Sequence, residues 1–145
     1  MTRIDFYVLD TADHIRRLKV VCKLAEKAAG AGERVFVHAD DSAMLEALDS
    51  SLWTFRANSF VAHSIVNSDD IEDANGGDPV QLSCAAPASD RTLLINLAEE
   101  VPLFFSRFER TLEVIDQSDD VRDAGRTRYR FYQHRGYPLK HHSLG

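Results

Sequence analysis

The stretch IDFYVLDTADHIRRLKVVCKLAEKAAGAGERVFVH, residues 4–38, decides the fold. Residues 4–9 are rich in strand-forming side chains. Apolar side chains then recur at helical spacing, which predicts a helix with Asp13 as its N-cap and Gly30 near its end. Residues 34–38 predict a second strand. The stretch therefore indicates a strand–helix–strand unit with two parallel strands.

The same alternation continues along the chain. A long final helix is expected from Ser118 or Asp119 to about Gln133. Alternating strands and helices predict an α/β fold, a Rossmann-like domain of three layers with a mostly parallel central sheet. Residues 1–145 are expected to form this single domain, with a frayed tail at about 140–145. Further strands are expected at residues 59–63, 80–83, 92–97 and 112–115, and a short helix after Pro102.

The composition is typical of a folded globular domain. The chain has 145 residues, of which 44% are hydrophobic and 28% are charged, which argues against wholesale disorder. Apolar runs are too short to span a membrane, and the first ten residues lack the apolar segment of a signal peptide. Cys22 and Cys84 are too few for a disulfide framework. They are expected to be buried thiols, which favours a cytoplasmic protein.

The sequence lacks the common motifs for phosphate, nucleophile and metal chemistry. It contains neither the GxxxxGK[ST] phosphate loop nor the GxSxG nucleophile elbow. Gly30-Ala31-Gly32 resembles the start of a dinucleotide fingerprint, but it follows a helix and the third glycine is missing, so a helix end is the simpler interpretation. The six histidines do not have metal-ligand spacing. Neither a cofactor nor a metal is therefore expected.

One enzyme hypothesis stays open. His38 ends the second predicted strand and Asp40-Asp41 follow it, at the position where parallel α/β sheets bind ligands. A nucleotide- or sugar-phosphate-binding enzyme could use these side chains, with Mg²⁺ on the two carboxylates. Capping of a second helix is the simpler role for Asp40 or Asp41, because no phosphate loop accompanies them.

Charge is distributed unevenly along the chain. The formal net charge is −6, yet residues 121–145 carry six of the seventeen basic side chains and a single acidic one. Residues 1–120 hold the other 11 basic and all 22 remaining acidic side chains. The acidic body argues against DNA binding over the whole surface, whereas the basic segment permits one acidic partner at one place.

The final predicted helix concentrates basic side chains on one face. Arg122, Arg126, Tyr129 and Arg130 recur at helical spacing, with Gln133 about one turn further on. The arginines either pair with the acidic body or form a socket for an acidic ligand, because guanidinium groups bind carboxylates and phosphates. Direct binding of single-stranded nucleic acid is a further alternative, which the acidic body disfavours.

A second group of side chains is aromatic. Trp53 stands near Phe55 and Phe60 in a segment without clear periodicity. These rings either pack in the core or anchor a partner protein. Two separate sites, one basic and one aromatic, favour an adaptor over an enzyme.

Several short motifs follow one another in a specific order and spacing: Asp5–Leu9, Gly32–Val37, Asp49–Trp53, Ser59–His63, Leu94–Leu97, Arg126–Tyr132 and Gly136-Tyr137. Together they resemble the chi subunit of bacterial DNA polymerase III holoenzyme, from about residue 3 to about residue 139. The resemblance implies a non-catalytic DNA replication subunit of the clamp-loader assembly. It also implies a fold like that of nucleotide-binding α/β domains, without the phosphate loop.

The resemblance implies two partners. Chi proteins bind the psi subunit, which tethers them to the clamp loader, and they hold the acidic C-terminal peptide of single-stranded DNA-binding protein. Trp53 and Phe60 match the aromatic positions that face psi, and in some bacteria a helicase-like protein uses that surface. Single-stranded DNA is then reached only indirectly, no membrane is involved, and the location is the cytoplasmic, nucleoid-associated replisome. The implied peptide pocket consists of Arg126 as its main arginine with Arg122, Tyr129, Arg130, Gly136 and Tyr137.

The sequence departs from the family pattern at two places. Arg122 and Arg130 stand where lysine is common, and arginine keeps the charge while adding planar bidentate pairing. The tail, residues 139–145, differs from relatives and lacks a late aromatic side chain. The resemblance therefore gives no reason to place the tail in the pocket.

Overall fold

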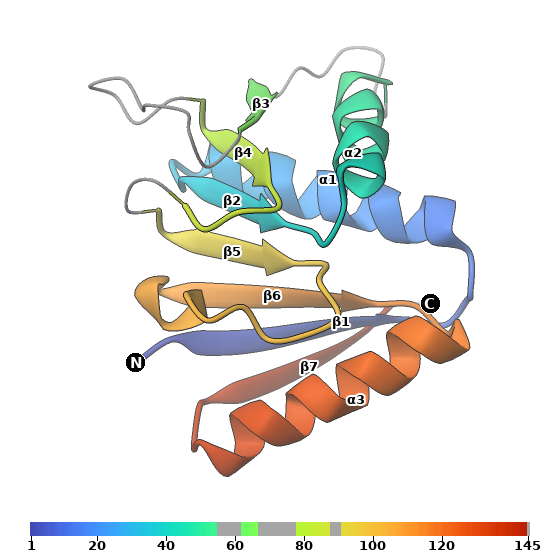
Figure 1. The fold of residues 1–145 in the computed structure, drawn as a ribbon, viewed down its shortest axis with the longest axis vertical. Coiled ribbons are helices and arrows are strands. Elements are labelled where there is room, and N and C mark those ends of the chain that lie inside the picture. Colours follow the sequence, from blue (N-terminus) through green and yellow to red (C-terminus); the bar gives the residue numbers. More distant parts are fainter. Residues whose placement is uncertain (55–61, 67–77, 88–90, 145) are drawn as a thin grey trace.

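One parallel sheet and the helices around it make up the part of the chain that the computed structural model describes, residues 1–54, 62–66, 78–87 and 91–144. In chain order the elements are β1 (Arg3–Leu9), α1 (His14–Gly30), β2 (Val35–His38), α2 (Ser42–Thr54), β3 (His63–Ile65), β4 (Val80–Ser83), β5 (Leu93–Asn96), the 3₁₀ turn η1 (Phe105–Arg107), β6 (Arg110–Ile115), α3 (Asp119–His134) and β7 (Leu139–Leu144). The described strands pair in the order β3-β4-β2-β5-β6-β1-β7, and every pair is parallel (Figure 1). The predicted α/β fold class is confirmed.

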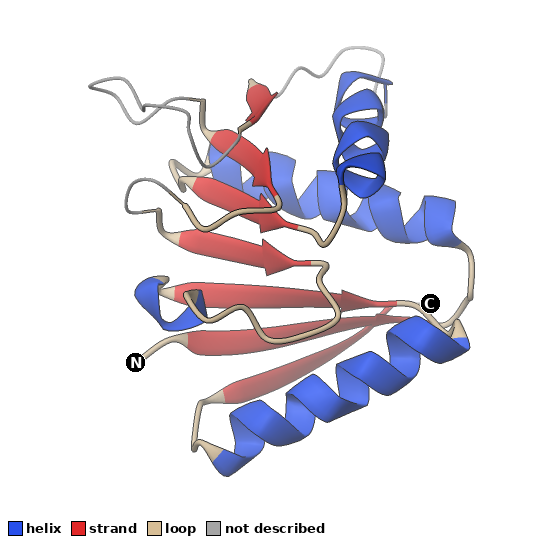
Figure 2. Ribbon diagram, viewed as in Figure 1, coloured by secondary structure: helices blue, strands red, loops and turns tan. Residues whose placement is uncertain are grey.

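Helices cover both faces of the sheet. α1 lies behind the sheet and α3 lies in front of it (Figure 2). Side chains of β1 alternate between two apolar clusters: Leu9 packs with residues of α1 and α2, whereas Phe6 packs with Phe105 of η1 and Tyr132 of α3. Successive side chains of a strand point to opposite faces, so β1 supplies both halves of the core.

Helix boundaries follow the predicted capping residues. The carboxylate of Asp13 accepts a hydrogen bond from the N–H of Ile15 at 2.9 Å. The carboxylate of Asp41 accepts one from the N–H of Met44 at 2.8 Å and so caps α2. α1 ends at Gly30, as predicted. These side chains satisfy N–H groups that lack a partner inside the first turn of a helix.

The strand order places α3 over β1. β1 lies between β6 and β7, and α3 connects those two strands, so the helix crosses β1 on its way. α2 and β3 lie at the other end of the sheet (Figure 1). Because the strands are parallel, their carboxyl ends meet at one edge, which is where the enzyme hypothesis places its residues.

The C-terminal tail differs from the prediction. Residues Leu139–Leu144 form β7, paired in parallel with β1, where fraying was expected. His142 fastens this strand: its Nε2 lies 3.0 Å from the carboxylate of Asp5, and its ring stacks on Tyr7 with centroids 4.5 Å apart. Burial alone raises the pKa of Asp5, but hydrogen bonds from His142 and Arg110 outweigh burial and hold that pKa below its ordinary value.

Two smaller expectations also change. β3 spans His63–Ile65 and so extends past the strand expected at residues 59–63, of which residues 59–61 lie outside the described part of the chain. Cys84 is exposed, although a buried thiol was expected. Cys22 is buried as predicted, and burial raises the pKa of its thiol to about 12.

Candidate functional site

A buried polar network fixes α3 to the sheet. Glu113 of β6 is fully buried, and its carboxylate accepts hydrogen bonds from Arg128 Nε at 3.0 Å and from the Tyr132 hydroxyl at 2.8 Å. Asn96 of β5 donates a third at 3.0 Å, and Arg128 also donates to the carbonyl of Glu99. Burial raises the pKa of the Tyr132 hydroxyl, so it stays protonated as a donor. A buried carboxylate is tolerated when a counter-charge and hydrogen bonds satisfy it, and this one ties α3 to β6 through two side chains, Arg128 and Tyr132.

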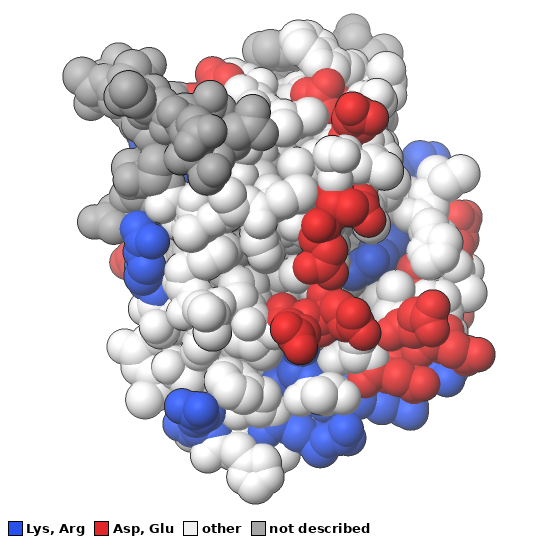
Figure 3. Space-filling model, viewed as in Figure 1, with Lys and Arg blue, Asp and Glu red and all other residues white. Residues whose placement is uncertain are grey.

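One side of α3 faces β1 and β7, where a cavity of about 240 Å³ opens. Basic side chains gather along α3, below the acidic ones (Figure 3). Arg122, Arg126 and Tyr129 line the cavity, so three members of the predicted stripe meet at one place. The other lining residues are Phe6 and Val8 of β1, Ile115 and Gln117 at the end of β6, Gly125 of α3 and His141 of β7.

Apolar groups form the inner wall of the cavity. The Tyr129 ring packs edge-to-face on Phe6, with centroids 5.1 Å apart. Gly125 allows α3 to approach β6 closely, because a Cβ at this position would lie 2.8 Å from Ile115 Cδ1. Any larger residue would displace Ile115, which lines the same cavity. A glycine inside a helix costs about 0.5–1 kcal/mol relative to alanine, and here the close packing explains it.

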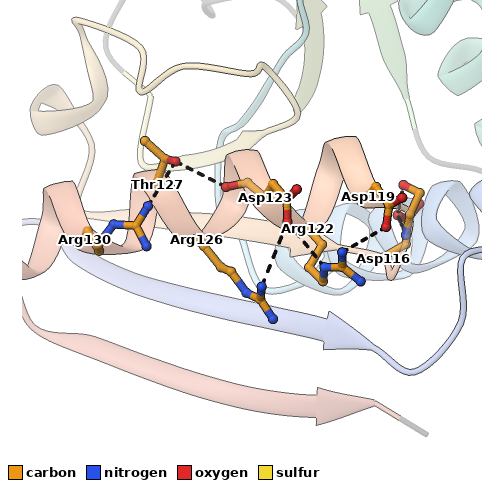
Figure 4. A network of polar contacts seen from close by, with 8 residues as sticks. Asp116, Asp119, Arg122, Asp123, Arg126, Thr127 and Arg130 are labelled. Carbon is orange, nitrogen blue, oxygen red and sulfur yellow. Dashed lines mark hydrogen bonds and ion pairs between the residues drawn. The ribbon is translucent and has the colours of Figure 1, made fainter.

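Cations form the rim, and they are partly paired within α3 (Figure 4). Arg122 Nη2 lies 2.9 Å from Asp119, and Arg122 Nε lies 3.4 Å from Asp123. Arg126 extends toward β1 and β7; its Nη1 lies 3.9 Å from Asp123 and its side chain is 66% exposed. Exposed ion pairs contribute about 0–1 kcal/mol, so an incoming carboxylate can replace them. The expected pairing of arginines with acidic side chains is therefore present, but within the helix itself.

Three residues of the implied pocket lie away from the cavity. Arg130 turns toward Thr127, with its Nη2 3.4 Å from the hydroxyl (Figure 4). Gly136 has a φ of +78° at the turn after α3, a left-handed conformation that favours glycine. The Tyr137 ring packs on Phe105, with centroids 5.0 Å apart. None of the three lines the cavity.

The sequence patterns do not identify six residues that also line the cavity: Phe6, Val8, Ile115, Gln117, Gly125 and His141. The strand pattern of β1 marks its apolar side chains only as core, because periodicity does not distinguish a cavity wall from a packed interior. Leu139 packs on the α3 side of the sheet, with the apolar cluster that includes Phe6 and Tyr132. Because alternate residues of a strand share a face, His141 also faces α3. The sequence could not place His141 in this way, because the tail was not expected to form a strand.

The aromatic site lies at the other end of the sheet, beside β3 (Figure 1). Trp53, in the last turn of α2, is 55% exposed, and its ring meets His63 edge-to-face at 5.1 Å. His63 Nε2 lies 3.1 Å from the carboxylate of Asp49. Phe60 lies outside the described residues. The structure therefore separates the two predicted sites by the width of the sheet.

The residues of the enzyme hypothesis have structural contacts. Asp40 accepts a hydrogen bond from the N–H of Glu99 at 2.8 Å, and Asp41 caps α2. The His38 ring packs edge-to-face on Phe104 at 5.0 Å. Burial lowers the pKa of His38, outweighing the opposite effects of a backbone hydrogen bond and of Asp40. All three side chains therefore support the fold at this edge.

A cleft of about 800 Å³ opens beside Asp40 and Asp41. Its two arginines, Arg17 and Arg128, are buried and already donate to a carbonyl and a carboxylate of β6. The acidic rim repels phosphate groups, and in the described ranges no three His, Cys, Asp or Glu side chains gather as metal ligands. The acidic residues of this cleft are Asp40, Asp41, Glu99, Asp120 and Asp123.

Comparison with known proteins assigns the chain to a family. The family model described as "DNA polymerase III chi subunit, HolC" matches residues 1–140. The chain belongs to the DNA polymerase III chi subunit family. The chi subunit of Pseudomonas aeruginosa is 43% identical over 145 residues, covering 99% of this chain and 98% of the relative. That of Escherichia coli K12 is 29% identical and covers 96% of each chain.

The fold of this chi family member also resembles a solved structure, the C-terminal domain of the DEAD-box protein Dbp5. The TM-score is 0.63 at 8% identity, covering 97% of this chain and 90% of the other. Such low identity shows a shared fold and nothing more. As a chi subunit, the chain is an accessory replication subunit of DNA polymerase III, which is consistent with a non-catalytic role. In the described ranges, every helix is too short or too polar to cross a membrane.

Proposed function

We propose that this chi family member links the clamp loader, through psi, to the acidic C-terminal peptide of single-stranded DNA-binding protein. It is an adaptor of the cytoplasmic, nucleoid-associated replisome and reaches single-stranded DNA only through that protein. The cavity beneath α3 carries the proposal, because it joins an apolar wall to two arginines at its rim, Arg122 and Arg126. That combination suits a peptide with carboxylates beside an apolar side chain.

Arg126 is the proposed main contact, with Arg122 and Tyr129 beside it. Hydrogen bonds to charged groups contribute about 1.5–3 kcal/mol each, and the cost of ordering a short peptide offsets part of this gain. Moderate, salt-sensitive affinity follows, because the arginines are partly exposed. Arg130, Gly136 and Tyr137 contribute only where the peptide continues along α3 beyond the cavity.

Trp53 and Phe60 are the proposed psi-binding residues. The exposure of Trp53 supports this assignment, because large aromatic side chains are frequent anchors of protein interfaces. The cavity and Trp53 lie at opposite ends of the sheet, so both partners can bind at once. A helicase-like protein is the proposed alternative partner at the Trp53 surface.

A fluorescence-anisotropy titration with a labelled acidic peptide ending in Asp-Ile-Pro-Phe tests the peptide site. Wild-type protein should bind it with salt-sensitive affinity, and Arg126→Ala should weaken binding about tenfold or more, which corresponds to about 1.4 kcal/mol. Arg135→Ala is the matched control, because it removes the same charge at the end of the same helix, outside both the cavity and the implied pocket. Absence of binding by folded wild-type protein, or equal losses in both variants, would contradict the proposed site.

A further inference from the structure

β7 contributes one ionisable side chain to the cavity. β1 and β7 pair in parallel, with His141 opposite Phe6, and both residues line the cavity. The neighbouring residues of β7 face the other way: His142 stacks on Tyr7, and Leu144 packs near α1. His141 is exposed, so a bound ligand and solvent can both reach it.

The charged groups that face His141 come from one element. From α3 these are Arg122 and Arg126, and the neutral phenol of Tyr129 lines the cavity as well. β1 presents only apolar side chains, and the segment after β6 presents the neutral amide of Gln117. The acidic groups near the cavity, Asp119 and Asp123, lie on α3 and pair with the arginines.

This placement puts an imidazole across the cavity from two guanidinium groups. A carboxylate bound between α3 and β7 can accept a charge-assisted hydrogen bond from the imidazolium form of His141 as well as from an arginine. Ligand binding and protonation of the imidazole then favour each other, as linkage requires.

We propose that His141 is a binding residue of this cavity, holding a carboxylate of the acidic peptide from the β7 side, so that peptide binding takes up a proton. The inference rests on the proposed function, because it concerns the same site. Histidine is the side chain whose charge ordinarily changes between pH 5 and 8, whereas peptide carboxylates ordinarily titrate near pH 4 and stay ionised in that range. Binding therefore tightens as the pH falls through this range.

Peptide titrations at about pH 8 and about pH 5.5, at constant ionic strength, test the inference. Wild-type protein should bind the acidic peptide about threefold or more tightly at the lower pH, within the tenfold change per pH unit that one proton allows. His141→Ala should remove this difference, and His141→Gln should restore a neutral hydrogen bond without restoring the pH dependence. His134→Ala is the control, because that histidine is an exposed residue of α3 away from the cavity.

The outcomes separate this inference from the proposed function. If Arg126→Ala binds the peptide as tightly as wild type at both pH values, the proposed peptide site itself is wrong. If Arg126→Ala loses binding while wild type and His141→Ala keep the same pH profile, only the role of His141 is overturned. A melting curve at each pH confirms that every variant is folded during the titration.

Discussion

Replacing Arg128 by methionine should destabilise the fold while leaving the peptide site intact. Arg128 is 3% exposed, and its partner Glu113 is fully buried. Without the guanidinium, the carboxylate keeps neutral donors from Asn96 and Tyr132 but loses its counter-charge. Removing one partner of a buried ion pair costs about 3–5 kcal/mol. At about 2–4 °C per kcal/mol for a domain of this size, the melting temperature should fall by about 6–20 °C.

The matched control removes both charges. The double variant Glu113→Gln/Arg128→Met leaves a neutral amide instead of a buried unpaired carboxylate, so it should lose less unfolding free energy than Arg128→Met alone. Urea denaturation at neutral pH measures both losses. An unfolding free energy for Arg128→Met within about 1 kcal/mol of wild type would refute this reasoning. So would a double variant whose loss equals the sum of the two single losses.

The neighbouring arginine should behave in the opposite way. Arg126 is 66% exposed and its ion pair spans 3.9 Å, so Arg126→Ala should change the unfolding free energy by no more than about 0.5 kcal/mol. Its peptide affinity should fall, whereas folded Arg128→Met should bind the peptide like wild type, because Arg128 does not line the cavity. Measuring stability and affinity on both variants therefore separates the structural arginine from the binding arginine.

Three further results are expected. Asp123→Asn should tighten peptide binding at low salt by up to about fivefold in an anisotropy titration, because it frees Arg126 from an ion pair worth about 0–1 kcal/mol and leaves Arg122 with Asp119 alone. Weaker binding would argue against this competition. The pKa of Asp5 is held below its ordinary value, so its stabilisation is present at neutral pH and is lost as the pH falls through the folded-state pKa. As the pH is lowered from about 5 to about 2, the unfolding free energy should therefore fall less for Asp5→Asn than for wild type. Equal decreases in urea titrations would show that Asp5 does not stabilise the fold in this way. A maleimide should label Cys84 in the native protein and Cys22 only after unfolding, because Cys22 is buried and the pKa of its thiol is raised to about 12. Mass spectrometry can count the labels, and two labels on the native protein would count against this prediction.

Local sequence patterns predict most of the helices and strands that position the site. The strand–helix–strand unit over residues 4–38 appears as β1, α1 and β2, because its apolar periods agree with its capping and turn residues. β7 was missed because its four central residues, 140–143, are polar on both faces, and an edge strand need not show the alternation of a half-buried one. What holds the edge strand is a tertiary contact, His142 on Asp5, which no local pattern reveals.

Helix phase explains which arginines reach the cavity. At 3.6 residues per turn, Arg126 lies about 40° around the axis from Arg122, and Arg130 lies about 80° from it. Arg130 therefore points toward Thr127 and away from β7. Arg128 is about 200° from Arg126, which points it into the sheet. Its burial was not expected, because a hydrophobic pattern treats every charge as exposed.

Axial distance explains the remaining departures. Gly136 follows Tyr129 by seven residues, a rise of about 10 Å along a helix. The turn at Gly136 and the ring of Tyr137 therefore lie past the cavity, against η1. The resemblance that groups these residues with the arginines gives their order in the sequence and not this distance.

The most direct test of the peptide site is a map of amide chemical shifts by NMR as the acidic peptide is added. We expect the largest changes on the residues that line the cavity, above all Arg122, Arg126 and Tyr129 of α3 and His141 of β7. Changes centred on Asp40 and Asp41 at the carboxyl edge of the sheet, with the cavity residues unmoved, would contradict the proposed peptide site.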